Sequence, residues 1–266
     1  MTIRYICTNQ VATLTIDRPA RRNALAPATM VELRDALIRF DTDTDARVAV
    51  LTGSGDRAFC AGADIHETVP AEQSFIQGFF DRTADSSHPL YIRNIALTKL
   101  ALSKPVIAAV NGIAVGGGME LALNCDLCIA SSNARFGLTE VRIGSIPAVA
   151  GIQRLMRSLP RAVAMYLLLT GEIVDAEYAL RWGLVSEVVE PSQLMTRAYE
   201  LANAIAANAP LAVKAAKLLA DKSAELPLGE AARLEELLWG HLYASKDRIE
   251  GRMAFAEKRR PVFRGE

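Results

Sequence analysis

The segment NGIAVGGGMELALNCD, residues 111–126, combines two features that each cost stability. Three consecutive glycines open a stretch that is otherwise apolar, and a single carboxylate, Glu120, follows them. Glycine weakens regular structure, and a buried unpaired charge costs more. A glycine turn lets the backbone approach a ligand, and the free N–H groups at a helix start attract an anion. The segment therefore predicts a strand, a glycine turn and a helix, with N–H groups and Glu120 facing a ligand.

The anion favoured by this turn is a developing oxyanion. A phosphate loop of the Walker type needs Gly-Lys-Ser/Thr, which the sequence does not have. A second loop, GSGDRAFCAGADI, follows a strand predicted to end at Gly53 and offers the small residues Ala61, Gly62 and Ala63. Two such loops can each give one N–H to a carbonyl oxygen, which would polarise a thioester or ketone and stabilise an enolate. The alternative is that both loops are only tight turns.

A second carboxylate, Glu140, stands in ARFGLTEVRIGSIP after an apolar stretch and before another glycine. Two glutamates in a cleft of low polarity can share a water, one accepting a proton and the other donating one. Desolvation and mutual repulsion would then raise at least one pKa above the ordinary ~4.3 of glutamate. The alternative for Glu140 is a surface ion pair with Arg142, two residues on.

Composition and motifs exclude several classes of function. The 266 residues are 51% hydrophobic, and 30 Lys and Arg balance 30 Asp and Glu, which gives no overall charge for nucleic acid. No secretory leader and no apolar run of membrane-spanning length is found, so we expect a cytoplasmic protein without a membrane partner. Cys125 and Cys128 form a lone C-x-x-C without further metal ligands, which favours buried thiols over a metal site. Motifs of the common hydrolases, kinases and dehydrogenases are missing.

The elements that would position the two loops follow from hydrophobic patterns. Short apolar runs at RVAVLTG, KPVIAAV, CDLCIAS and GLVSEVV, with an alternating strand over residues 12–16, predict a mostly parallel sheet covered on both faces. Helical spacing predicts helices at 26–41, 89–102, 161–171 and 175–183, the last with Asp175 as N-cap and Gly183 as its stop. The fold class is therefore α/β.

Beyond about Pro191 the strands cease, and three segments carry apolar faces at helical spacing. One stripe runs through Ala231, Leu234, Leu238 and His241 or Leu242. Such faces must be buried against the α/β body or against neighbouring subunits. We therefore divide the chain into a core, residues 1–191, and an α-helical region, residues 192–266.

Six blocks of the sequence resemble the crotonase superfamily, and within it the enoyl-CoA hydratases. They are AFCAGADI, KPVIAAVNGIAVGGGMELALNCD, ARFGLTEVRIGSIP, GIQRL, LTGEIVDAEYALRWGLVSEVV and EGRMAFAEKRRPVF, in the family's order from the first strand to the C-terminus. The resemblance implies a spiral of ββα units with an α-helical C-terminal trimerisation region. It also implies a homo-oligomer, a trimer or a dimer of trimers.

The resemblance further implies a reversible syn addition of water to a 2-enoyl-CoA thioester. Glu120 and Glu140 match the two catalytic glutamates, with Glu120 as base and Glu140 as proton donor, and the N–H groups of Ala63 and Gly117 match the oxyanion hole. The residues that match contacts to coenzyme A are Ala61, Asp64, Ile65, His66, Phe255 and Lys258. For Lys258 a solvated surface charge is an equal alternative. Coenzyme A belongs to the substrate, and we expect no separate cofactor and no metal.

The sequence also departs from the family's pattern. Thr139 stands where a proline is common before the second glutamate, and SIPAVAG, residues 145–151, stands where GIPGAGG is common. The added methyl and isopropyl groups predict a changed acyl pocket beside Glu140. The loop between Asp64 and Lys104 also looks longer than in compact hydratases. Other readings stay open: a Δ3-Δ2 enoyl-CoA isomerase, a dehydratase of a CoA-linked hydroxyacyl or carnitinyl-like substrate, and a non-catalytic acyl-CoA-binding protein.

Overall fold

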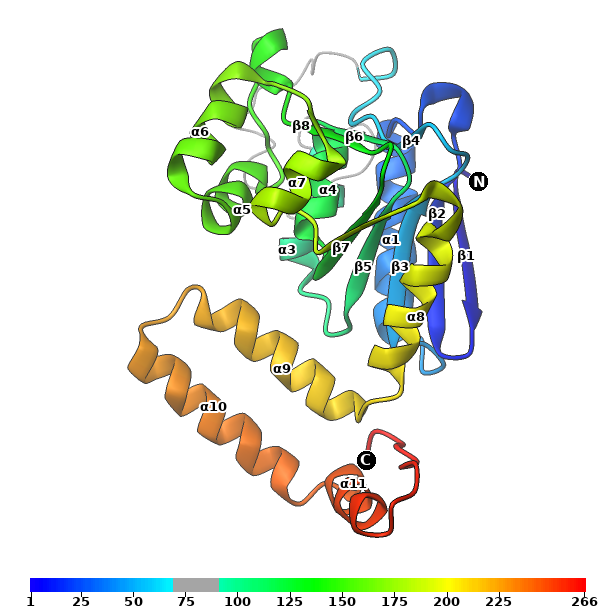
Figure 1. Ribbon diagram of the computed structural model, residues 1–266, viewed down its shortest axis with the longest axis vertical. Helices are drawn as coiled ribbons and strands as arrows, with labels where there is room; N and C mark the ends of the chain where they lie inside the picture. Colours follow the sequence, from blue (N-terminus) through cyan, green and yellow to red (C-terminus); the bar gives the residue numbers. More distant parts are fainter. Residues whose placement is uncertain (69–90) are drawn as a thin grey trace.

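The computed structural model describes residues 1–68 and 91–266, and Figure 1 shows the course of the chain. Its larger sheet has the strand order β1-β2-β3-β5-β7-β10. These strands are β1 (Ile3–Thr8), β2 (Val11–Ile16), β3 (Val48–Gly53), β5 (Val106–Val110), β7 (Leu127–Ser131) and β10 (Glu187–Val189). Within this sheet β1 and β2 pair antiparallel and every other pair is parallel. The mostly parallel sheet predicted from the apolar runs is confirmed.

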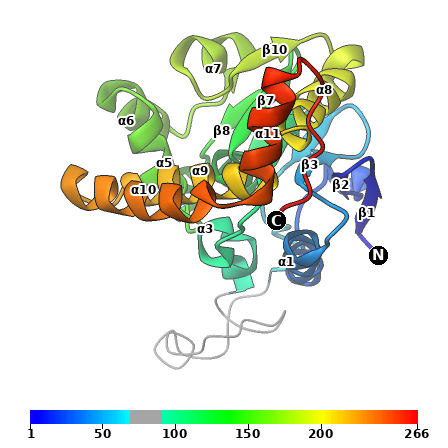
Figure 2. The same cartoon turned by 90° about the horizontal axis from the view of Figure 1, so that it is seen from below.

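Helices cover both faces of the larger sheet, which explains why its central strands are apolar throughout. Along β3, Ala49 and Leu51 face the main core with α1 (Pro27–Thr42), whereas Val48 and Val50 face a second core with α8 (Leu194–Ala206). Figure 2 shows α1 and α8 on opposite sides of the strands. A strand buried on both sides needs no polar positions, so its sequence does not alternate.

Four helices of the core lie near the smaller sheet or connect its strands, and the signals predicted for the helix at 175–183 are confirmed. They are α4 (Gly117–Asn124), α5 (Gly151–Ser158), α6 (Arg161–Thr170) and α7 (Ala176–Trp182). The Asp175 side chain caps α7 by accepting a 2.8 Å bond from the Tyr178 N–H, and Gly183 ends that helix with a φ of 80°. The helix predicted at 89–102 is wrong as a continuous element. Residues 91–102 contain a 3-10 turn, η2 (Tyr91–Ile95), and a single helical turn, α3 (Leu97–Leu100), while residues 89 and 90 lie outside the described ranges.

A second sheet, which the sequence patterns did not reveal, has the order β4-β6-β8-β9. Its strands are β4 (Ala58–Cys60), β6 (Ile113–Val115), β8 (Arg135–Gly137) and β9 (Val174–Asp175). The first three run parallel to their neighbours, and β9 pairs antiparallel with β8. Strands of two or three residues are too short to display a period. Two expectations are corrected as a result: the Ala61–Ala63 loop follows β4 rather than β3, and β6 intervenes between β5 and the glycine run.

The C-terminal helices α9 (Pro210–Ser223), α10 (Leu228–Tyr243) and α11 (Lys246–Ala256) extend away from both sheets (Figure 1). The stripe of Ala231, Leu234, Leu238 and Leu242 is the less exposed side of α10, but much apolar surface stays open. Trp239, Leu237 and Phe255 are 58%, 65% and 87% exposed. α8 packs on the larger sheet rather than with this extension, and the division of the chain at residue 191 stays a prediction.

Polar contacts tie the extension to the body and hold its last residues in place, and among them is the ion pair of Lys217 on α9 with Asp126. The Arg47 guanidinium donates to the carbonyl oxygens of Ala206 and Phe263, at 2.9 and 2.6 Å. The Asp247 carboxylate, only 3% exposed, accepts the N–H groups of Arg264 and Gly265 and so folds the last residues back onto α11. No helix in residues 1–68 and 91–266 is long and apolar enough to cross a membrane.

Candidate active site

Three segments of the chain meet because the strands before them are neighbours in the smaller sheet. β4, β6 and β8 lie side by side and parallel, so their carboxyl ends share one edge. From that edge emerge residues 61–64, the glycines 116–118 and Glu140, the first residue of η3 (Glu140–Ile143). The Gly116 N–H donates to the Gly137 carbonyl oxygen at 2.9 Å, and a methyl group built on Gly116 would lie 3.4 Å from Glu140 Oε1. The two glycine loops and both glutamates are thus brought together.

The glycines in these loops are required by close backbone approach. Gly116 adopts φ 55° and ψ −132°, a conformation open essentially to glycine. A methyl group on Gly118 would lie 2.0 Å from the Cys60 carbonyl oxygen, so only glycine lets α4 pack directly on β4. Gly62 has a φ of 83°, and a methyl group there would lie 3.2 Å from the Gly117 nitrogen. The reading of these loops as tight turns is correct but incomplete, because the turns also bring two N–H groups together.

Those two N–H groups belong to Ala63 and Gly117. Neither donates to any residue in the described ranges, whereas the neighbouring Asp64 and Gly116 N–H groups bond the carbonyl oxygens of Leu25 and Gly137. A methyl group on Gly117 would lie 3.9 Å from the Ala63 nitrogen, so the two donors are close. Gly117 is the first residue of α4, where the helix dipole adds positive potential. The pair suits a developing oxyanion better than a neutral group.

Glu120 is almost fully buried, with 2% of its surface exposed. Its Oε1 accepts the Val149 N–H at 2.8 Å and the Gly151 N–H at 2.9 Å. Gly151 is the first residue of α5, so this carboxylate sits at a second helix N-terminus, and a methyl group on Gly151 would lie 2.6 Å from Glu120 Cγ. Burial raises the pKa of Glu120, while the N–H bonds oppose the rise by stabilising the carboxylate.

Glu140 has a different environment. It is half-buried, and its Oε2 is covered but accepts no hydrogen bond from the described residues. Burial, with a smaller contribution from the negative charge of Glu120, raises its pKa to about 7. Arg142 does not pair with it: the guanidinium bonds the Thr170 carbonyl oxygen at 3.2 Å and the Glu172 carboxylate at 3.1 Å. The alternative of a Glu140–Arg142 surface pair is therefore wrong.

Two carboxyl groups in unlike surroundings can divide acid and base work. Glu120 has N–H donors that favour its ionised form, whereas desolvation outweighs hydrogen bonding at Glu140, which keeps its proton to near-neutral pH. Beside them lie two free N–H donors for an oxyanion. The arrangement can take a proton from water, deliver another to carbon and hold the negative charge formed between these steps.

The remaining candidates lie in three different places. Asp64 is 4% exposed; its Oδ2 lies 3.2 Å from Arg18 Nη1, in ion-pair range although not in hydrogen-bond alignment. It thus anchors the loop that carries Ala63. Ala61, Ile65 and His66 flank that loop, with Ile65 69% exposed and His66 also exposed. Phe255 and Lys258 lie at the end of α11, remote from α4 along the long axis of the molecule (Figure 1), so one chain does not bring them to the glutamates.

The altered turn at residues 148–150 borders the other glutamate. We expected its larger side chains to change a pocket beside Glu140, but Val149 is 2% exposed and its isopropyl group packs in the main core. The backbone of this turn instead supplies the donors to Glu120. Sequence reasoning missed this role of Val149 and Gly151. The one available signal was the glycine at the start of the GIQRL block, which marks a close approach.

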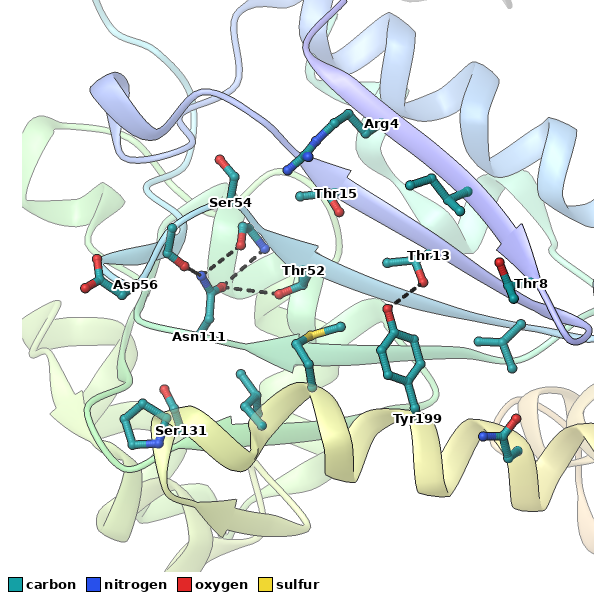
Figure 3. A pocket seen from close by; sticks show the side chains of 18 of the residues that line it. Arg4, Thr8, Thr13, Thr15, Thr52, Ser54, Asp56, Asn111, Ser131 and Tyr199 are labelled. Carbon is teal, nitrogen blue, oxygen red and sulfur yellow. Dashed lines mark hydrogen bonds between the residues drawn. The ribbon is translucent and has the colours of Figure 1, made fainter.

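A sizeable cavity lies elsewhere in the described part of the chain. It has a volume of about 710 Å³ and lies between α8 and strands β1 to β3, as Figure 3 shows. Threonine and asparagine side chains dominate its polar lining, a 3.1 Å bond between Tyr199 and Thr13 spans it, and its described lining includes neither glutamate. Its lining, as described, lacks a pair of carboxyl groups beside free N–H donors, and we therefore place the candidate active site at the edge of the smaller sheet.

Comparison with known proteins finds similar sequences and structures along nearly the whole chain. A family model described as enoyl-CoA hydratase/isomerase matches residues 7–266. The (E)-benzylidenesuccinyl-CoA hydratase of Thauera aromatica is 45% identical over 100% of both chains, and the short-chain-enoyl-CoA hydratase of Clostridium acetobutylicum is 41% identical over 94% of this chain and 93% of its own. A crystal structure of an enoyl-CoA hydratase from Bacillus anthracis superposes with a TM-score of 0.90 at 36% identity, covering 100% of each chain.

The raised pKa of Glu140 predicts a pH-dependent gain in stability for Glu140→Gln. The folded chain keeps this proton up to a pH of about 7, whereas the unfolded chain loses it near the ordinary pKa of 4.5, so wild-type stability falls across this interval. Glutamine does not ionise, so the variant does not lose stability across this interval. The variant should match wild type near pH 4.5 and exceed it above pH 7 by on the order of 1 kcal/mol, after discounting for solvent screening.

Denaturant unfolding at several pH values between 4.5 and 8 measures the difference. The exposed Glu235→Gln variant serves as the control for loss of one negative charge. A Glu140→Gln gain that is the same at every pH would show that Glu140 titrates normally in the folded chain.

Proposed function

The chain belongs to the enoyl-CoA hydratase/isomerase family, and we propose that it is an enoyl-CoA hydratase. It adds water reversibly across the double bond of a 2-enoyl-CoA thioester. The observation that carries this proposal is the unequal pair of glutamates beside two free N–H donors. Hydratase relatives aligned along nearly the whole chain support it.

Each group then has one role in the addition. Ionised Glu120 takes a proton from water as the water oxygen bonds to Cβ, and the electrons of the double bond move to the thioester oxygen. The N–H groups of Ala63 and Gly117 stabilise this enolate. Neutral Glu140 then gives its proton to Cα. The site is reset when the proton taken by Glu120 passes to Glu140 through solvent, so that one water has been consumed.

The same groups acting in reverse would dehydrate a 3-hydroxyacyl-CoA, so the geometry supports both directions. An isomerase moves one proton between two carbons and needs one carboxyl group, which leaves the second buried glutamate without a task. A non-catalytic binding protein would have no need for either glutamate, and two buried carboxyl groups carry a desolvation cost. Hydration is therefore the reading that uses every group at the site.

Replacing each glutamate by glutamine tests the proposal. Glutamine keeps the shape but neither accepts nor donates a proton usefully near neutral pH. Glu120→Gln and Glu140→Gln should each lower kcat for hydration of a short 2-enoyl-CoA by roughly 10²–10⁴. Because both are needed for the same addition, the double variant should be little worse than the poorer single variant.

Loss of the conjugated enoyl-thioester absorbance reports the rate, and calorimetry checks that acyl-CoA binding survives in all three variants. Glu235→Gln again controls for charge. If wild type moved the double bond without taking up water, and Glu120→Gln retained that activity, the isomerase reading would replace ours. Absence of turnover with all enoyl- and hydroxyacyl-CoA chain lengths would favour a binding protein.

The extended C-terminal helices support a homo-oligomer built on trimers. Their open apolar surface, including Leu237, Trp239 and Phe255, is unusual for a monomer in water. The helix α11, which contains Phe255 and ends two residues before Lys258, lies far from α4, which contains Glu120 (Figure 1). In our proposal α11 of a neighbouring copy carries these two side chains to the coenzyme A moiety.

Light scattering at micromolar concentration should therefore show an oligomer, and complementation should show the shared site. Glu120→Gln and the double variant Phe255→Ala/Lys258→Ala should each be poorly active alone. After mixing under conditions that exchange subunits, some sites combine intact glutamates with an intact neighbouring helix, and activity should return. A monomer, or an exchanged oligomer with no recovered activity, would contradict the shared site.

A further inference from the structure

Asn124, the last residue of α4, is a buried amide with an unusual set of partners. It is 6% exposed, and its Nδ2 donates to the carbonyl oxygens of Glu120 and Val149, both at 2.8 Å. Its Oδ1 is buried and accepts no hydrogen bond from the residues that the structure describes. An unpaired buried acceptor destabilises a fold. Stability alone therefore does not explain an amide here.

The bond to Val149 holds one particular peptide. The Val149 carbonyl belongs to the peptide unit between Val149 and Ala150. On either side of that unit lie the two N–H groups, of Val149 and Gly151, that donate to Glu120 Oε1. Two side chains of α4, four residues apart, thus bind the same loop. Glu120 accepts its N–H groups, and Asn124 donates to the carbonyl oxygen between them.

The turn needs this restraint because its central residue is strained. Ala150 has a φ of 69° and a ψ of 13°, the left-handed conformation that a side chain with a Cβ disfavours. This conformation sets the directions in which the flanking N–H groups point. A strained backbone persists where its surroundings over-determine it, and here Glu120 and Asn124 do so.

We infer that Asn124 is a positioning residue, which holds the 148–151 turn in the conformation that directs two N–H donors at the Glu120 carboxylate. Its effect on catalysis rests on the proposed role of Glu120 as base. Its effect on the carboxylate itself does not depend on that role.

Losing this restraint would weaken the hydrogen bonds from the Val149 and Gly151 N–H groups to Glu120. A carboxyl group with weaker donors holds its proton to higher pH. Glu140 on η3 is the nearby titratable group that the charge of Glu120 affects. The elements packed against α4 carry four further titratable side chains, namely Cys60 on β4, Lys99 on α3, and Arg154 and Arg157 on α5. A change at residue 124 removes none of these five groups. A shift in the Glu120 titration would therefore report a change in the conformation of the 148–151 turn.

The test is Asn124→Leu, which keeps the branching and the number of side-chain heavy atoms and removes the donors. The acid limb of the pH profile of kcat/KM should move to higher pH by roughly 0.5 to 1, and kcat/KM at neutral pH should fall about five- to tenfold. Ala150→Gly in the same chain should move the limb back and recover most of the rate, because glycine adopts the left-handed conformation without strain.

A second readout does not require turnover. Infrared or ¹³C NMR titration of the Glu120 carboxyl, assigned with Glu120→Gln, should show a higher pKa in Asn124→Leu than in wild type. Asn111→Ala is the matched control: that amide also donates to two backbone carbonyls, those of Gly53 and Gly55, but away from the glutamates. It should lose thermal stability and leave the Glu120 titration unchanged.

The outcomes separate the two proposals. A shifted Glu120 titration in a protein without hydratase activity would retain the positioning role and reject the function. An unshifted titration in Asn124→Leu, or a shift that Ala150→Gly does not reverse, would overturn the positioning role whatever the activity.

Discussion

Parallel pairing of three very short strands is the constraint on which the active site depends. β4, β6 and β8 contribute only Ala58–Cys60, Ile113–Val115 and Arg135–Gly137, yet their register places three distant parts of the chain at one edge. The glycines make this approach possible, because a side chain at Gly118 would meet the Cys60 carbonyl oxygen. The larger sheet and its two cores supply the stability that such short strands cannot supply alone. The glycines 116–118 and Glu120 are neighbours in the sequence because the same short segment has to allow close backbone packing and place a carboxyl group at the candidate site.

The chemistry follows from how two similar carboxyl groups are solvated. Both lose water on folding, which favours their neutral forms. Glu120 regains part of that solvation from the start of α5, whereas Glu140 has a covered oxygen without a donor. The difference in hydrogen bonding separates their proton affinities, and the nearby charges reinforce it. Two glutamates can therefore differ in protonation at the same pH when a turn donates N–H groups to one of them and not to the other.

The elements that depend on residues close together in the sequence could be predicted from the sequence. Continuous apolar runs predicted the larger sheet, Asp175 and Gly183 bounded a helix, and the three glycines before Glu120 predicted the start of another helix. The features that were missed are long-range. Strands of three residues carry no period, Gly151 meets Glu120 across 31 positions, and Arg142 takes partners near residue 171 instead of Glu140. The strained turn at Ala150 and its restraint by Asn124 could be seen only once the backbone was placed.

The origin of the atoms added to the substrate tests the proposed addition of water most directly. Wild-type protein would be incubated with a short 2-enoyl-CoA in ¹⁸O-labelled D₂O, and the product would be analysed by mass spectrometry and NMR. We predict one ¹⁸O on Cβ and one deuterium on Cα, added to the same face of the double bond. Deuterium at Cγ without ¹⁸O, or a substrate recovered without either label, would contradict the addition of water by Glu120 and Glu140.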